Sequence, residues 1–344
     1  MTTYNVHDPD EIRTRLAEYL TAMTGYPAKV PHVEQLPGGA SRETWRVDAV
    51  LNEQENRFVL RRDLPTVMYD KALSREQEYH ILQLVHDSGV AVPQPRWYNT
   101  EPQILGSCFL IMDYVEGFTI GRKIVSMAAL DGARQLLPGQ MAEQLAHIHG
   151  VHVPSEAYSF LTGFADDETP VQRTIREIRE MLEKLHIDSP VFEFGLRWCE
   201  EHAPQTQEKV LLHGDFRIGN VIVTESGLQA IIDWEFAHIG DPHEDLAWPT
   251  LRDWRFGQGQ QRFGGIADRE PFLIAYEEAS GRPVDRDTVD FWEILGNIRW
   301  AATALSQSQR HLSGGDLNIE LASLGRRSAE MQLEMLLLIQ MQGL

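Results

Sequence analysis

Two stretches, "HGDFRIGN" at residues 213–220 and "IIDWEF" at residues 231–236, decide the fold of this chain. Short apolar runs typical of buried strands adjoin both stretches, and the interval between them suits one tight turn. A strand-turn-strand unit of this size brings Asp215, Asn220 and Asp233 to the same end of a sheet. We therefore expect oxygen-bearing side chains to gather there.

The residue types in this cluster predict a particular chemistry. Carboxylate and carboxamide oxygens suit Mg²⁺, which proteins hold through one or two side chains together with substrate phosphates. A second carboxylate that stays off the metal can accept a hydroxyl proton and orient the oxygen. Arg217 follows Asp215 by two residues and can neutralise charge on a phosphoryl group in transfer. Asp215 and Arg217 are thus predicted to be catalytic.

The same arrangement occurs in protein kinases, where a catalytic-loop Asp precedes an Asn and a metal-binding Asp lies on the next pair of strands. Over nearly its whole length, roughly residues 30 to 310, the chain resembles the aminoglycoside phosphotransferase / choline-kinase-like family. The most specific part of the resemblance is "HGDFRIGN" followed by "IIDWEFAHIGDPHEDLAW" at residues 231–248. Residues 96–118 and 296–331 resemble the branch of the family that is related to domains fused with acyl-CoA dehydrogenases.

The resemblance implies an α+β, protein-kinase-like, two-lobed fold. Residues 1–113 are predicted to form a nucleotide-binding lobe, a small antiparallel sheet with one packed helix that follows an N-terminal helix. The packed helix is expected over residues 74–89, with Tyr79, Leu82 and His86 on one side and Gly89 at its end. Residues 114–344 are predicted to form a larger, mostly helical lobe for catalysis and acceptor binding.

The resemblance also assigns roles. Asp215 matches the catalytic base, and Asn220 and Asp233 match the Mg²⁺ ligands. His213 is expected to brace the loop, and the acidic pair Asp241 and Asp245 to tie the loop to the helix that follows.

The nucleotide site is predicted in the first lobe. Gly38, Gly39 and Ser41 are expected at a strand turn, where glycines would let backbone N–H groups approach phosphates. Where the family has a phosphate-binding Lys, this chain has Arg61, and Arg62 is the alternative. Arg62 should point to the opposite face, because strand side chains alternate. Glu78, or Glu76, matches the helix residue that pairs with this cation. The positions at the adenine are Met112, Asp113 and Val115, and they do not distinguish ATP from GTP.

Composition limits the partners. The 344 residues carry a formal charge of −20 at pH 7, which disfavours nucleic acid and anionic membrane surfaces. The two cysteines make no disulfide framework, and no signal peptide or membrane-spanning run is evident. We therefore expect a cytoplasmic protein that binds a nucleotide and a small-molecule acceptor.

Several alternatives stay open at this point. A catalytically silent nucleotide-binding regulator is the second interpretation, because the lobe lacks the usual Lys. A metal-dependent hydrolase is the third; its site would consist of His213, Asp215, Asp233, Asp241 and His243. The acceptor could be an aminoglycoside, a sugar, a choline-like compound or a hydroxyacyl compound. The Gly/Gln-rich loop at residues 257–265 is either a lid over the acceptor or a passive linker.

Overall fold

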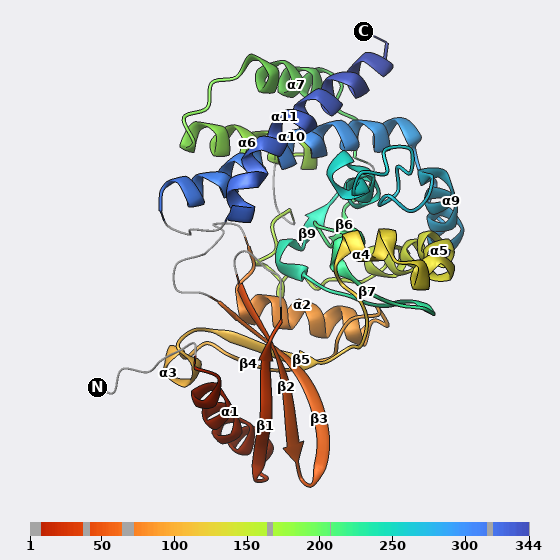
Figure 1. Cartoon of the computed structure of the whole chain (residues 1–344). Helices are drawn as coiled ribbons and strands as arrows, with labels where there is room; N and C mark the ends of the chain where they lie inside the picture. The colour runs from red at the N-terminus through yellow and green to blue at the C-terminus, as the bar shows by residue number, and fades with distance from the viewer. Residues whose placement is uncertain are drawn as a thin grey trace. The chain divides into compact units, whose positions relative to one another are not determined.

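The computed structural model describes residues 8–36, 42–63, 72–163, 168–206, 208–314 and 319–343. The chain divides into two compact units, one with the residues up to Asp87 together with Val92–Glu116, the other with Ser88–Ala91 and the residues from Gly117 onward. The first unit contains an antiparallel sheet with helices, and the second is mostly helical (Figure 1). The predicted α+β class is therefore confirmed, whereas the functions assigned to residues 1–113 and 114–344 stay predictions.

The first unit is built on one five-stranded sheet in which every neighbouring pair is antiparallel. In sheet order the strands are β1 (Ala28–Gln35), β2 (Arg42–Leu51), β3 (Gln54–Asp63), β5 (Phe109–Asp113) and β4 (Pro95–Asn99). The helices of this unit are α1 (Pro9–Thr24), α2 (Arg75–Asp87) and the short α3 (Pro102–Leu105).

Alternating burial explains how this sheet packs. Trp45 and Val47 on β2 are buried in one core with Phe58 and Leu60 on β3. On each strand the two buried residues are two positions apart in the sequence. Successive strand residues point to opposite faces, so one face of each strand enters this core. The apolar stripe of α1, which includes Leu16, packs into the same core. Burying each such side chain contributes about 1.5–3 kcal/mol.

The buried face of α2 differs from the expected one. The helix buries Glu78, Ile81, Leu82 and Val85, whereas Tyr79 is only half-buried. Leu82 is therefore buried as expected, and the buried face also holds the Glu78 carboxylate, which the apolar pattern did not indicate. The predicted end is confirmed, because Gly89 follows the helix with φ +86°.

The second unit combines two small antiparallel pairs of strands with many helices. Strand β6 (Val210–Leu212) pairs with β9 (His238–Gly240), and β7 (Val221–Thr224) pairs with β8 (Gly227–Ile231). The α-helices are α4 (Gly121–Ser126), α5 (Asp131–His149), α6 (Pro170–Lys184), α7 (Pro190–Glu201), α8 (Pro242–Ala247), α9 (Arg269–Ser280), α10 (Arg286–Leu312) and α11 (Ile319–Met341). Short 3₁₀ turns are η1 (Ala128–Leu130), η2 (Ile218–Asn220), η3 (Trp234–Phe236), η4 (Trp248–Thr250) and η5 (Arg252–Arg255).

Helix α10 is the central support of this unit. It packs along α11 and also contacts α6, α7 and α8 (Figure 1). Its buried residues include apolar Ile294 and Leu295 and also charged Glu293. Within the part of the chain that the structure describes, no helix is both long and apolar enough to cross a membrane.

Candidate active site

The β7–β8 hairpin places the predicted metal-binding residues at one end. Val221 pairs with Ile231 in the antiparallel register, so Asn220 and Ile232 face each other just beyond the paired strands. The Ile232 N–H donates to the Asn220 carbonyl oxygen at 2.9 Å. Asp233 is the next residue after Ile232, so this bond fixes the backbone of both predicted metal ligands. The predicted strand-turn-strand unit is therefore present.

Asp215 lies beside this hairpin end and accepts hydrogen bonds on both carboxylate oxygens. Its Oδ2 accepts from Asn220 Nδ2 at 2.6 Å. Its Oδ1 accepts from Arg217 Nε at 3.0 Å and from the indole Nε1 of Trp248 at 2.6 Å. The Asp215 side chain is 16% exposed, so the carboxylate is held in place yet remains reachable.

The backbone of this loop is clamped from both sides. Asp245 is buried, and its two carboxylate oxygens accept from the N–H groups of His213 and Gly214 at 2.6 and 3.0 Å. His213 is also buried, and its Nε2 hydrogen-bonds the Ile232 carbonyl at 3.0 Å. His213 thus joins the Asp215 loop to the strand that leads to Asp233. Only glycine suits position 214, where φ is +80° and a Cβ would lie 2.3 Å from the Phe236 carbonyl oxygen.

Asp233 has an unusual backbone conformation. Its φ of 70° and ψ of 58° are left-handed, which is uncommon for a residue other than glycine. Asp tolerates this region better than most residues, at a cost of order 1 kcal/mol or more. Strained residues of this kind gather at functional sites, and here the strain falls on the residue that the sequence singles out as a metal ligand.

The donor set fits a hard divalent cation. The Asn220 amide nitrogen bonds the carbonyl and carboxylate oxygens of Asp215, which leaves the Asn220 Oδ1 as the atom available to a cation. Together with the Asp233 carboxylate this gives oxygen donors, the type that Mg²⁺ prefers. Among the described residues there is no group of three or more His, Cys, Asp or Glu side chains placed to hold a metal ion.

The residues proposed for a metal hydrolase are already engaged within the protein. The two ring nitrogens of His213 bond the Ile232 carbonyl and the Asp215 N–H. His243 bonds Asp241 through Nδ1 at 2.7 Å and accepts the Asp285 N–H on Nε2. Asp241 caps helix α8 by accepting the His243 N–H. Neither imidazole is therefore presented to a metal, which disfavours the hydrolase interpretation.

In the first unit, Arg61 and Arg62 have different partners. Arg61 Nη1 donates to Glu78 Oε1 at 2.8 Å, and Glu78 also pairs with Arg75. Arg62 is buried on the opposite face of β3, where it pairs with Glu43 and donates to the Leu105 carbonyl at 2.9 Å. Arg61, at 12% side-chain exposure, is the better placed of the two for a ligand.

Glu78 rather than Glu76 is the ion-pair partner on α2. The Glu76 carboxylate instead accepts from the Tyr98 hydroxyl at 3.1 Å. Asp63 lies close to the same group and pairs with Arg75 at 2.9 Å. Burial, followed by the negative charge of Glu78, raises the pKa of Asp63 to about 6, although Arg61 acts in the opposite direction. Arg61 therefore lies in a crowded set of carboxylates.

The other predicted nucleotide positions can be placed only in part. Met112 is buried on β5, and the Asp113 N–H donates to the Gln94 carbonyl oxygen at 2.9 Å. The Asp113 side chain forms a two-point ion pair with Arg96 at 2.6 and 2.7 Å. Val115 is half-buried. Gly38, Gly39 and Ser41 lie outside the described residues. Nucleotide contact at all of these positions stays a prediction.

Two side chains that support the site were not anticipated. Trp248 donates to Asp215, and it lies three residues after Asp245, so both side chains project from the same face of a helical turn. His149, the last residue of α5, is buried with Nε2 3.6 Å from Asp245. Its Nδ1 bonds the Tyr276 hydroxyl at 2.7 Å, and burial lowers the pKa of His149.

The loop at residues 257–265 is anchored at its C-terminal end. Phe263 is fully buried and stacks on Phe272 with ring centroids 4.3 Å apart. Arg262 pairs with the buried Glu293 of α10, and the Gly264 N–H donates to the Pro249 carbonyl at 3.0 Å. These contacts favour the linker interpretation of the loop over a lid.

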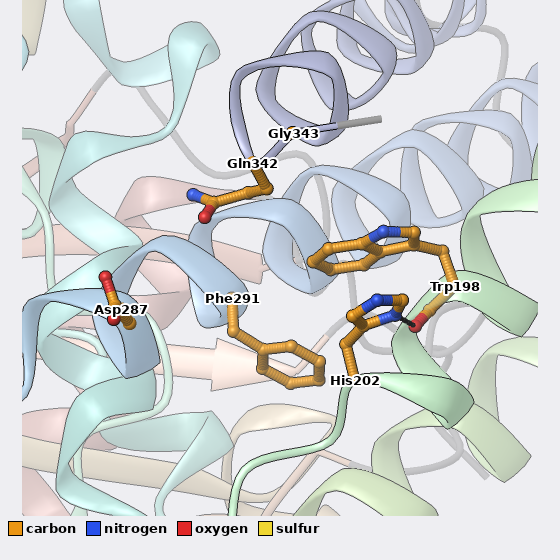
Figure 2. Close-up of a pocket in the computed structure, with 6 residues that line it drawn as sticks. All are labelled: Trp198, His202, Asp287, Phe291, Gln342 and Gly343. Atoms are coloured by element: carbon orange, nitrogen blue, oxygen red, sulfur yellow. Dashed lines mark hydrogen bonds between the residues drawn. The ribbon is translucent and has the colours of Figure 1, made fainter.

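A cavity of about 270 Å³ lies elsewhere in the second unit. Trp198, His202, Asp287, Phe291, Gln342 and Gly343 line it (Figure 2). The Trp198 and His202 rings stack with centroids 4.4 Å apart. None of these residues belongs to the predicted active site, so the cavity and that site share no lining residue.

Comparison with known proteins identifies relatives over most of the chain. A family model described as "Phosphotransferase enzyme family" matches residues 32–292. Acyl-CoA dehydrogenase family member 11 of Pongo abelii is 24% identical over 90% of this chain and 40% of its own length. An aminoglycoside 3'-phosphotransferase of Niallia circulans is 23% identical over 45% of this chain and 58% of its own. The chain therefore spans less than half the length of the acyl-CoA dehydrogenase relative.

Solved structures share the fold. A putative aminoglycoside phosphotransferase of Ralstonia eutropha JMP134 superposes with a TM-score of 0.72 at 22% identity, over 94% of this chain and 96% of its own. A choline/ethanolamine kinase family protein of Mesorhizobium loti gives a TM-score of 0.60 at 18% identity, over 96% and 99% of the two chains. The predicted protein-kinase-like fold, with its sheet lobe and its helical lobe, is confirmed.

Proposed function

Because this chain belongs to the phosphotransferase enzyme family, we propose that it transfers the γ-phosphoryl group of a nucleoside triphosphate to a hydroxyl of a small molecule. One observation supports this most strongly. Asp215, Asn220 and the residue before Asp233 are joined by hydrogen bonds at one hairpin end. This arrangement puts a reachable carboxylate next to Asn220 and the backbone that leads to Asp233, which are the residues we propose as oxygen donors for a cation.

We assign the roles as follows. Asp215 accepts the hydroxyl proton and orients the attacking oxygen, as a general base must do from hydrogen-bond distance. Arg217 has its Nε on Asp215 and its guanidinium 4.3 Å above the Trp254 ring, and it offers charge to the transferring phosphoryl group. Asn220 and Asp233 would hold Mg²⁺, which would neutralise charge on the phosphates.

The nucleotide is proposed to bind the first unit. Arg61, fixed by Glu78, would grip phosphate oxygens, and a guanidinium can do so in a two-point manner that an ammonium cannot. Gly38, Gly39 and Ser41 would contribute backbone N–H groups, and Met112, Asp113 and Val115 would border the base. ATP and GTP both satisfy this set. Solved relatives in complex with ADP and spectinomycin, and with GDP and kanamycin, support a purine nucleotide.

For the acceptor we propose a metabolite, with hydroxyacyl compounds as the first class to test. The Pongo abelii relative named for an acyl-CoA dehydrogenase matches 90% of this chain, whereas the aminoglycoside 3'-phosphotransferase matches 45%. The acceptor is therefore sought among metabolites before antibiotics.

The test is a search for a product. The protein is incubated with a water-soluble metabolite extract and Mg²⁺-ATP, or Mg²⁺-GTP in parallel, and new compounds heavier by one phosphoryl group are sought by mass spectrometry. Asp215→Asn is the control for the chemistry. Saturable nucleotide binding with no product from any acceptor would instead support the silent regulator. Absence of both binding and product would refute the proposal.

A further inference from the structure

The two oxygens of the Asp215 carboxylate are not equivalent. Oδ1 accepts two hydrogen bonds, from Trp248 Nε1 at 2.6 Å and from Arg217 Nε at 3.0 Å. Among the residues that the structure describes, Oδ2 accepts one, from Asn220 Nδ2 at 2.6 Å. A carboxylate oxygen has two lone-pair sites, so Oδ1 is saturated while Oδ2 keeps one site. The carboxylate thus has an anchored oxygen and an oxygen that can take a further hydrogen bond.

Trp248 is well suited to act as the anchor. It is 6% exposed and packs in a cluster with Leu251 and Trp254. The guanidinium of Arg299 lies 5.2 Å from the centre of the Trp248 ring. Arg299 is itself fixed by the buried Glu244, at 2.6 Å between Nη1 and Oε1. The indole therefore has little freedom to move away from Asp215.

Trp248 also connects the carboxylate to the support of its own loop. Asp245, one helical turn earlier, holds the N–H groups of His213 and Gly214. The segment from Asp245 to Trp248 thus grips both the backbone before Asp215 and the side chain of Asp215. Arg217, by contrast, has been assigned to the phosphoryl group, and it can leave Oδ1 when a nucleotide binds. Trp248 is a neutral donor without that second task.

We propose that Trp248 is a positioning residue that fixes Asp215 Oδ1, so that Asp215 Oδ2 faces the acceptor hydroxyl. This rests on the proposed phosphotransferase function. In the step, the acceptor O–H bond breaks and its proton passes to Oδ2. The acceptor oxygen bonds the γ-phosphorus, and the bond from that phosphorus to the bridging oxygen breaks, with the electron pair leaving on the nucleoside diphosphate. Without Trp248 the carboxylate would rotate and Oδ2 would lose its alignment.

The chain offers a matched control. Trp300 packs against the same aromatic cluster, 4.8 Å from Trp254 between ring centroids. Its indole Nε1 donates to a carboxylate as well, but to Asp253 at 2.7 Å. Trp248→Phe and Trp300→Phe therefore remove the same chemical group from the same cluster, and only the first removes a contact with Asp215.

The experiment measures release of nucleoside diphosphate with Mg²⁺-ATP and the metabolite extract, together with calorimetric binding of Mg²⁺-ATP. Trp248→Phe is expected to lower turnover about 10- to 100-fold, the usual cost of losing a residue that orients a functional group. The affinity for Mg²⁺-ATP should be unchanged. Trp300→Phe is expected to keep wild-type turnover. Since Trp248→Phe also changes packing, the second variant carries β-(3-benzothienyl)alanine at position 248, which keeps the shape and lacks the N–H.

The outcomes are separable. Reduced turnover in both position-248 variants, with normal nucleotide affinity, supports the proposal. Wild-type turnover in the benzothienyl variant overturns it, because the N–H would then be dispensable. An equal loss in Trp300→Phe also overturns it, because packing alone would explain the effect. If the wild-type protein binds no Mg²⁺-ATP and releases no diphosphate, the proposed function itself fails.

Discussion

Asp215 and Glu293, both in the second unit, show two ways in which a protein holds a carboxylate. Asp215 is partly exposed and has one Arg and two neutral N–H donors around it. Glu293 has no exposed surface and pairs with three arginines, Arg255, Arg262 and Arg269. The first arrangement fixes a carboxylate and leaves it reachable. The second surrounds a carboxylate with charge and closes it off from solvent.

The difference lies in what each group contributes. Burial raises the pKa of Glu293, and its three arginines act in the opposite direction. This network connects η5, the 257–265 loop, α9 and α10, which is a structural task. Asp215 connects fewer elements, and its contacts orient one side chain. We therefore expect loss of Asp215 to reduce activity and loss of Glu293 to reduce stability.

The largest effect is expected for Asp215→Asn. The amide keeps the shape but cannot take a proton, so turnover should fall by about 10²- to 10⁴-fold, the range of a general base. The measurement is diphosphate release with Mg²⁺-ATP and the metabolite extract. The urea midpoint of unfolding should change little, because the site is partly solvated. A variant that retained wild-type turnover would remove Asp215 from the chemistry.

Glu293→Gln should produce the opposite result. Three arginines would lose their common partner in a buried site, and breaking a buried ion pair costs about 3–5 kcal/mol in free energy of unfolding. Equilibrium urea unfolding measures this cost, and turnover of the folded fraction should be near that of the wild type. Glu143→Gln is the control: this glutamate is exposed on α5, and its loss should cost within about 0.5 kcal/mol. Equal stability of the two variants would contradict the comparison.

Glu244 sharpens the comparison, because it is a second buried carboxylate with the opposite pKa shift. Burial acts to raise its pKa, but the charge and hydrogen bond of His238, followed by Arg299 and Arg173, outweigh burial and lower the pKa to about 2. A folded pKa below the ordinary 4.5 stabilises the protein above pH 4.5, and this stabilisation is lost as pH falls towards 2. Its size is about 3 kcal/mol at most.

The check is urea unfolding of the wild type and of Glu244→Gln at several values of pH between 5 and about 2. The difference in unfolding free energy between the two proteins should shrink as the pH falls through this window. A difference that stays constant across the window would show that Glu244 is not held in its charged form by these neighbours.

The sequence predicted the parts of the site that are local in the chain. The hairpin end with Asn220 and Asp233 follows from apolar runs and a short turn, and these features decide strand pairing within a few residues. The alternation of side chains along a strand separated Arg61 from Arg62, and the structure gives each a different partner. Such predictions need only the geometry of one element.

What the sequence could not predict depends on contacts between distant segments. His149 reaches Asp245, and Arg299 reaches Trp248, only because α5 and α10 pack beside the loop. No local pattern distinguishes these residues from ordinary helix residues. The expected face of α2 is confirmed at Leu82 but did not include Glu78, which is buried where it pairs with Arg61 and Arg75.

Arg61 and Arg62 show the same contrast between a charge proposed to bind a ligand and a charge that supports the fold. Substitutions at these two positions give the smallest effect that we predict. Arg61→Met should weaken binding of Mg²⁺-ATP about tenfold or more, the loss of a hydrogen bond to a charged group, while Glu78 stays paired with Arg75. Arg62→Met is the matched control: it removes the arginine that pairs with the buried Glu43, and it should lower stability with little change in nucleotide affinity. Calorimetric titration measures the affinity of both variants for Mg²⁺-ATP, and urea unfolding measures their stability. If Arg62→Met weakens binding while Arg61→Met does not, the phosphate grip belongs to the other face of β3.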